Sequence, residues 1–275
     1  MTDELLAIAR AAVAEGAKML GTAERGTVRA KGDRDFVTDL DHRIQDALRE
    51  RLAICTPGFG FIGEESAPAD ADLDAEYAWA LDPIDGTSNF IHGLPLCAVS
   101  LALVHRGQPL IGVIEAPFLN LAYYGAADRG AYVNDRPIGV SATRTLDSAI
   151  VSLGDYAVGP DARTKNERRL AVTAALADTV ERVRMFGSAA LDLVWVAEGR
   201  TDACVILSNQ PWDTAAGVLI ARESGALISD STGAPHSFDS ADTIAATPAI
   251  AARLQALLLP GARGSGRDPR PEPTG

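Results

Sequence analysis

The sequence has few of the residues that build disulfide frameworks or zinc sites. It contains three cysteines and four histidines in 275 residues. Cys55, Cys97 and Cys204 are odd in number, widely separated and set in apolar surroundings, so we expect buried free thiols and no disulfide. The histidines are equally scattered, without the paired spacing of a helical zinc motif or a nearby nucleophile motif. Neither residue type indicates a function.

Several common binding signatures are also missing. The chain lacks the Gly-rich phosphate loop and the Gly-x-Gly-x-x-Gly turn, which argues against nucleoside triphosphates and dinucleotides as ligands. The net charge of −12 and the pI of about 4.8 argue against nucleic acid and anionic membranes as partners. The segment Met1-Thr2-Asp3-Glu4 is acidic where a signal peptide is basic, and no apolar run reaches membrane-spanning length. We expect a cytoplasmic protein.

An apolar run followed by two acids is the most informative segment. Residues 77–81 predict a buried strand that ends in Asp82, and Pro83 then stiffens a turn that leads to Asp85. The Gly86-Thr87 pair is typical of a helix start. Carboxylates bind divalent cations, and free N–H groups at a helix start bind anions. The segment therefore suits a metal-dependent phosphoryl hydrolase.

Three further acids lie at the predicted ends of helices or strands. Glu64 follows an apolar strand, Asp41 begins a helix over 40–52, and Asp213 falls in the first turn of another helix. Each has an ordinary explanation taken alone: a solvated loop at Glu64, a capping box with Thr38 at Asp41, and a favourable helix dipole at Asp213. Taken together they favour a common site, because clustered carboxylates repel one another unless cations offset the repulsion.

These motifs resemble those of the inositol monophosphatase family of magnesium-dependent, lithium-sensitive phosphatases. The resemblance spans residues 1–258 and rests on four segments: Gly63-Glu-Glu65, Asp82-Pro-Ile-Asp85-Gly-Thr87-Ser-Asn-Phe90, Gly187-Ser-Ala-Ala190 and Trp212-Asp-Thr-Ala-Ala-Gly217. It implies an α/β (α+β) fold, a layered α-β-α-β-α sandwich with the site between two halves.

The apolar pattern divides the chain into two halves and a tail. Residues 1–147 predict helices packed on a mostly antiparallel sheet, with a Gly- and charge-rich link through residues 31–33 between the first two helices. The resemblance implies that this half carries most of the metal ligands. Residues 148–259 alternate strands and helices, as in an α/β unit, and among them we expect helices over 211–223 and 248–258 and a strand over 243–246. Residues 260–275 are rich in Gly, Pro and Arg, and we expect a disordered tail there.

The resemblance implies a site with two or three Mg²⁺ ions, a pair that activates water, and a substrate-binding turn. The implied metal ligands are Glu64, Asp82, Ile84 through its carbonyl, Asp85 and Asp213. The implied catalytic residues are Asp41, Thr87 and Glu65. The implied substrate contacts are Asp85, Gly86, Thr87, Gly187, Ser188, Ala189 and Asp213.

The alcohol part of the substrate is the least constrained. Inositol-specific members typically carry a glutamate seven residues before the position of Asp213, and this chain has Ile206 there. Because isoleucine cannot accept a hydrogen bond from a ring hydroxyl, we expect the alcohol to be held loosely; alternatively, Ile206 is a core residue and Ser208 or Asn209 supplies the contact. The resemblance implies a homodimer that hydrolyses a small phosphate monoester, inositol monophosphate or a related polyol phosphate. Histidinol phosphate, a sugar bisphosphate or a 3′-phosphonucleotide is the alternative substrate. A regulatory or binding protein that retains the fold is the non-enzymatic alternative.

Overall fold

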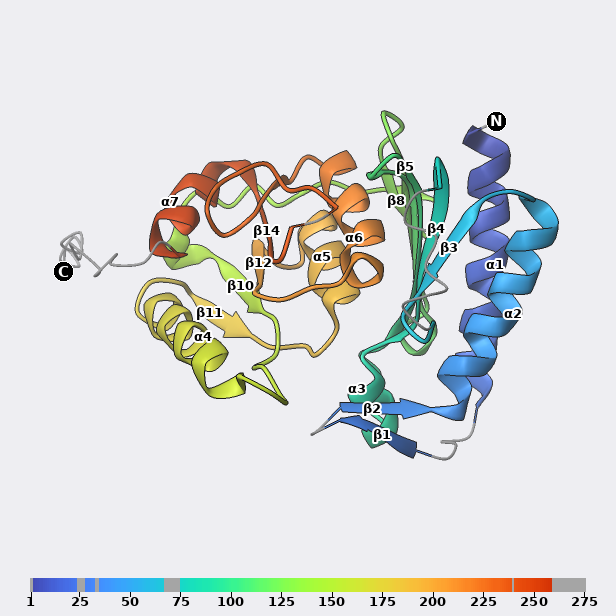
Figure 1. Cartoon of the computed structure of the whole chain (residues 1–275). Helices are drawn as coiled ribbons and strands as arrows, with labels where there is room; N and C mark the ends of the chain where they lie inside the picture. Colours follow the sequence, from blue (N-terminus) through green and yellow to red (C-terminus); the bar gives the residue numbers. More distant parts are fainter. Residues whose placement is uncertain (1, 24–27, 33–34, 67–74, 239, 259–275) are drawn as a thin grey trace, which may run out of the picture.

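The computed structural model describes residues 2–23, 28–32, 35–66, 75–238 and 240–258. Helices and two sheets alternate in five layers, in the order helix, sheet, helix, sheet, helix (Figure 1). The expected α-β-α-β-α sandwich is confirmed. Three clusters of buried apolar side chains fill the spaces between the layers.

Two long helices form the outer layer on the first sheet. α1 (Thr2–Thr22) and α2 (Asp39–Cys55) bury one face each, with apolar residues spaced about four apart as the sequence predicts. Both helices pack on the sheet through the same apolar cluster. One expectation is wrong here: Cys55 is exposed, because it is the last residue of α2 and lies beyond the buried stripe. Cys97 and Cys204 are buried free thiols, as expected.

The first sheet has seven strands in the order β3-β4-β5-β6-β7-β8-β9. β3 runs parallel to β4, and every other neighbouring pair is antiparallel, so the mostly antiparallel sheet is confirmed. The strands are β3 (Gly60–Gly63), β4 (Tyr77–Asp85), β5 (Ala98–His105), β6 (Gln108–Ala116), β7 (Leu121–Ala126), β8 (Ala131–Val133) and β9 (Arg136–Pro137).

β4 is longer than its apolar pattern predicts. The expected strand ends at Leu81, whereas the observed strand continues to Asp85. Its pairing with β5 shifts register between Asp82 and Asp85, as in a β-bulge. Pro83 lies inside this irregular stretch, where a missing backbone N–H does not interrupt a regular ladder. The six-residue helix α3 (Thr87–His92) follows, so the predicted helix start at Gly86-Thr87 is confirmed.

The middle layer consists of α5 (Ala189–Ala197) and α6 (Pro211–Glu223), which lie between the two sheets (Figure 1). α6 approaches β6 so closely that a Cβ added to Gly112 would stand 2.5 Å from the carbonyl oxygen of Ala216. Only glycine fits at this position, because any side chain would displace the helix backbone.

The second sheet has five strands in the order β11-β10-β12-β14-β13, and α4 (Ala162–Ala177) and α7 (Pro248–Leu258) cover its outer face. β10 pairs in parallel with β11 and β12, while β14 pairs antiparallel with β12 and β13. The strands are β10 (Ile150–Leu153), β11 (Arg182–Arg184), β12 (Ala203–Ile206), β13 (Leu227–Ser229) and β14 (Thr243–Ala246).

The sequence pattern missed one hairpin. β1 (Val28–Gly32) and β2 (Asp35–Thr38) form an antiparallel pair where a Gly- and charge-rich link is predicted. Segments this short, flanked by glycine and charged residues, show too few alternations to be recognised as strands. The predicted tail, residues 260–275, lies outside the described residues.

Candidate active site

Glu64 and Asp82 come together because β3 and β4 are parallel neighbours. The register aligns Gly63 with Leu81, and the Glu64 N–H donates to the Leu81 carbonyl at 3.1 Å. The residues that follow the aligned pair, Glu64 and Asp82, therefore lie side by side where β3 ends. Glu64 is half-buried, and Asp82 is only 3% exposed.

Asp82 is buried beside other acids. Its pKa is raised well above the ordinary range by burial, and the charges of Glu64, Asp85 and Asp213 raise it further. Its Oδ1 accepts a hydrogen bond from the Ile84 N–H at 3.0 Å, which fixes the carboxylate over the irregular part of β4. Acids from three separate stretches of the sequence therefore lie close enough to raise the pKa of Asp82.

Asp41 serves as a helix cap and also contacts Thr87. Its Oδ2 accepts from the Thr38 N–H at 2.8 Å and from the Thr38 hydroxyl at 2.5 Å, which completes a capping box at the start of α2. The ordinary explanation is therefore correct, but it accounts for only one oxygen. The Thr87 hydroxyl lies 3.4 Å from Asp41 Oδ1 and 2.9 Å from the Ile84 carbonyl. Burial is the main cause of the raised pKa of Asp41, and the Glu64 charge adds to it.

Asp85 is held by the N-terminus of α5. The Ser188 hydroxyl and the Ala190 N–H donate to its Oδ2, the latter at 3.0 Å, and the Ala189 N–H donates to its Oδ1 at 3.1 Å. Burial raises the pKa of Asp85 to about 6, although these hydrogen bonds oppose the rise. Ser188 also caps α5 by accepting from the Leu191 N–H at 3.2 Å. Ser188 and Ala189 thus bind Asp85 here, and their contact with a substrate stays a prediction.

The Gly187 turn lies against the start of α3. Gly187 adopts a left-handed φ of +70°, which favours glycine, and a Cβ added to Gly86 would stand 3.1 Å from the Gly187 carbonyl oxygen. The Asn89 amide ties the two segments together by donating to the carbonyls of Phe186 at 2.7 Å and Leu96 at 2.8 Å. Asn89 stands in the recognised motif, but no role was predicted for it.

Asp213 and Ile206 come from the second half of the chain. Asp213 forms a capping box at the start of α6, where its Oδ2 accepts from the Gln210 N–H at 2.8 Å. Its charge also acts on Asp82, so the site spans both halves. Ile206 is 4% exposed on β12 and belongs to the apolar cluster between the sheets. It is a core residue, which was the alternative to a role in substrate recognition.

Glu65 is positioned by a residue that the sequence analysis did not single out. The Glu65 N–H donates to Gln45 Oε1 at 2.9 Å, and Gln45 is buried on α2. A polar residue on the buried face of a predicted amphipathic helix is the signal that could have identified it. The Glu65 side chain is half-buried, and its catalytic role stays a prediction.

The oxygen atoms of the site are of the kind that binds a hard cation, although the acids are not arranged as a complete coordination sphere. Within the described ranges, no group of three or more His, Cys, Asp or Glu side chains is arranged as a metal-coordination site. The available atoms are carboxylate and carbonyl oxygens, which Mg²⁺ and Ca²⁺ prefer. A cation would also relieve the repulsion that acts on buried Asp82. The assignment of individual metal ligands stays a prediction.

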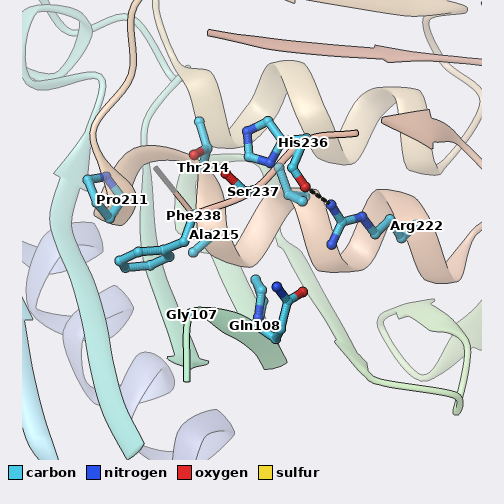
Figure 2. A pocket seen from close by; sticks show the side chains of 11 residues that line it. Gly107, Gln108, Pro211, Thr214, Ala215, Arg222, His236, Ser237 and Phe238 are labelled. Atoms are coloured by element: carbon cyan, nitrogen blue, oxygen red, sulfur yellow. Dashed lines mark hydrogen bonds between the residues drawn. The ribbon is translucent and has the colours of Figure 1, made fainter. Parts of the chain in front are cut away.

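Two hollows are lined by other residues. One, of about 10 Å³, is lined by residues of the β5–β6 turn, α6 and the segment before β14, and Arg222 there donates to the His236 carbonyl at 2.8 Å (Figure 2). It has room for about one water molecule. The other, of about 300 Å³, lies between α2 and β3 and is lined by Phe59, Phe61 and Trp79 among others. Neither is lined by a predicted site residue.

Comparison with known proteins decides the family. The sequence profile of the inositol monophosphatase family matches residues 1–263. The chain belongs to the inositol monophosphatase family. Members of this family are phosphatases and generally depend on metal, so the chain is a phosphoric monoester hydrolase. No helix among the described residues is long and apolar enough to cross a bilayer.

Individual relatives agree with this membership. An inositol-1-monophosphatase of Mesorhizobium japonicum is 35% identical over 241 residues, which are 87% of this chain and 89% of that protein. A putative Nus factor SuhB of Neisseria meningitidis serogroup B is 34% identical over 229 residues, which are 83% of this chain and 86% of that protein. The crystal structure of the extragenic suppressor protein SuhB of Bartonella henselae superposes with a TM-score of 0.86 at 32% identity, covering 94% of this chain and 99% of that chain.

Proposed function

We propose that this phosphatase hydrolyses inositol monophosphate or a related small polyol phosphate with Mg²⁺. The observation that carries the proposal is the convergence of Glu64, Asp85 and Asp213 on buried Asp82. The name of the Mesorhizobium relative supports the choice of substrate. When bound by these acids and the Ile84 carbonyl, Mg²⁺ would neutralise charge on the phosphoryl oxygens and on the attacking and leaving oxygens.

Asp41 and Thr87 would move the proton. The Thr87 hydroxyl can accept a proton from an attacking water and pass its own to Asp41 Oδ1, 3.4 Å away. The raised pKa of Asp41 favours this role, because a base works best when its pKa approaches the working pH. The bond that forms is water oxygen to phosphorus, and the bond that breaks is phosphorus to the alcohol oxygen.

The phosphate would lie at the start of α3. The backbone N–H groups of Gly86 and Thr87 are at the helix N-terminus, beside the carboxylates of Asp82 and Asp85. Because α3 has only six residues, its dipole is small, and the local N–H groups would contribute most of the interaction.

Phosphate release from a panel of monoesters, with and without Mg²⁺, tests the proposal. The panel contains myo-inositol 1-phosphate, glycerol 2-phosphate, histidinol phosphate, a sugar bisphosphate and a 3′-phosphonucleotide. We expect Mg²⁺-dependent release with the highest kcat/KM for the polyol esters, and inhibition by Li⁺. A higher kcat/KM for histidinol phosphate or the nucleotide would show that the polyol ester is not the preferred substrate. Insensitivity of an active preparation to Li⁺ would contradict the ligand set of Asp82, Asp85 and Asp213.

A regulatory role is the second candidate, and the Neisseria relative's name is the observation that favours it. The net charge of −12 argues against direct binding to nucleic acid, so such a role would require a protein partner. Absence of phosphate release from every ester at saturating Mg²⁺, in a folded preparation, would favour the regulatory role. We also propose a cytoplasmic homodimer, which sedimentation and cell fractionation would test.

A further inference from the structure

The larger hollow, between α2 and β3, is lined mainly by apolar and aromatic side chains. Phe59, Phe61 and Trp79 line it from β3, β4 and the residue before β3, and Leu52 and Ala53 line it from α2. Its volume of about 300 Å³ is at the lower end of the range for sites that bind small molecules. Aromatic side chains pack well against a flat ring, so a small ring compound suits this lining.

The polar groups in this lining bind one another. The Trp79 indole donates from Nε1 to the Thr56 hydroxyl at 3.0 Å, and the Thr56 hydroxyl donates to the Leu52 carbonyl at 2.7 Å. The Phe59 ring is held by stacking on Tyr77, with 4.9 Å between the ring centroids. These side chains therefore offer a ligand apolar contact in a fixed arrangement and require no hydrogen bond from it.

Arg49 adds a positive charge to the lining. Its guanidinium carbon lies over the Phe61 ring, 5.6 Å from the ring centroid, in a cation–π contact. Within the described ranges, no acid forms an ion pair with Arg49, and its side chain is exposed. A guanidinium in this position can donate to a carboxylate that enters from solvent. The lining is therefore complementary to a flat ring that carries a negative charge.

Phe61 connects the hollow with the segment that carries Glu64 and Glu65. A Cβ added to Gly63 would stand 2.8 Å from Phe61 Cε1 and closer still to Gln45 Oε1, so the Phe61 ring and the Gln45 amide lie side by side over this glycine. Gln45 Oε1 accepts from the Glu65 N–H at 2.9 Å. The same ring therefore borders both the hollow and the hydrogen bond that holds Glu65.

We propose that this hollow binds a small aromatic carboxylate, and that the bound ligand stabilises the contact between Gln45 and Glu65. The ring of the ligand fills the space beside Phe61 and keeps the Phe61 ring against the Gln45 amide. The hollow is separate from the acids of the site, since Leu52 follows Asp41 by eleven residues on α2, roughly 16 Å along the helix axis. The ligand is therefore an effector and not a substrate.

Isothermal titration calorimetry with three probes tests the binding site. The probes are 2-naphthoate, the neutral 2-naphthylmethanol, and acetate, which has the charge without the ring. We expect 2-naphthoate to bind most tightly. Arg49→Gln should weaken 2-naphthoate by roughly 2- to 10-fold and leave the neutral compound unchanged. Phe61→Leu should weaken both ring compounds. Arg43→Gln, which removes an exposed arginine of α2 outside the lining, is the matched control and should change neither.

Amide hydrogen exchange followed by NMR tests the effect on Glu65. Opening of the Gln45–Glu65 contact requires space that the ligand occupies. Exchange of the Glu65 amide should therefore slow by up to about 10-fold when the 2-naphthoate concentration is about ten times its Kd. The Ser231 amide is the matched control, because it donates to a side chain in the second half, Asp242 Oδ1 at 2.7 Å, and its exchange should not change.

Three results would overturn the inference. Absence of 2-naphthoate binding to the wild type at millimolar concentration would show that the hollow is not a ligand site. Equal affinity of wild type and Arg49→Gln for 2-naphthoate would show that it does not select an anion. Unchanged exchange of the Glu65 amide in the 2-naphthoate complex would show that the ligand is not an effector. Both measurements are independent of phosphate release, so failure of the proposed function would leave them interpretable.

Discussion

The two halves of the chain contribute acids that differ in number and in burial. The first sheet and the helices joined to it supply acids that are almost fully buried, such as Asp41 at 0% and Asp82 at 3% exposure. The second half supplies Asp213, which is half-buried in the first turn of α6. Charges interact more strongly when they are buried than when water and salt screen them. The first half therefore contributes most of the buried charge of the site, and the second half adds one acid to it.

Asp82→Asn is expected to have the largest effect. The amide is a poor ligand for divalent cations, so turnover should be essentially lost. The fold should persist with equal or higher stability, because the substitution removes a charge that three other acids oppose. Phosphate release and thermal unfolding measure the two effects, with Asp178→Asn as the control. Full activity at saturating Mg²⁺ would contradict the proposed ligand role.

Thr87→Ala should reduce kcat by about 10²–10⁴-fold, the range for a positioned proton-transfer group. The affinity for Mg²⁺ should change little, because Thr87 donates to Asp41 and Ile84 and is not a proposed ligand. Thr87→Ser keeps the hydroxyl and should retain most activity. If the loss disappeared at high Mg²⁺, Thr87 would support the metal site and not the proton transfer.

Ile206→Glu tests whether position 206 is a core position or recognises the substrate's alcohol. Ile206 packs in the apolar cluster between the sheets, so a carboxylate there would be buried without a partner. We expect a loss of about 3–5 kcal/mol in the free energy of unfolding and no gain toward inositol phosphate. Ile206→Val, which costs about 0.5–1.5 kcal/mol, is the control in denaturant titrations. A stable variant with sharper preference for the inositol ester would restore a recognition role to this position.

Asp192→Asn should have the smallest effect, visible in the pH dependence of stability. Burial raises the pKa of Asp192 to about 8. The folded state therefore holds a proton that the unfolded state has lost, and wild-type stability falls as the pH rises from about 4 to about 8. Asparagine does not titrate, so the stability of the variant relative to wild type should grow by up to ~1.4 kcal/mol per pH unit in this window. Denaturant titrations at pH 5, 6 and 7 measure the slope, and parallel curves would contradict it.

The sequence was sufficient for the elements that carry strong end signals. α6, α7 and β14 have the predicted bounds, because proline at a helix start and a short apolar strand mark them clearly. The bulge in β4 was not predictable, since an apolar pattern records which residues are buried and not where the ladder shifts. The β1–β2 hairpin was missed for lack of a pattern.

The site divides in the same way. The acids of the first half stand in long motifs, and the predicted association of Asp82 with Glu64, Asp85 and Asp213 agrees with the charges that act on it. The contact between the Gly187 turn and the start of α3 had no such signal, because the two segments lie far apart in the sequence. Sequence patterns do not identify contacts that form only through the tertiary structure.

The contact between Gly112 and Ala216 has a consequence for motion. α6 carries Asp213 at its N-terminus, and its middle rests directly on the backbone of β6 in the first sheet. A hinge that opened the two halves would have to break a close contact between main chains, with no side chain to adjust. The distance between Asp213 and Asp82 is therefore fixed by the backbone. A cation bound between them would be selected by how well its radius fits this distance, and not by closure of the two halves around it.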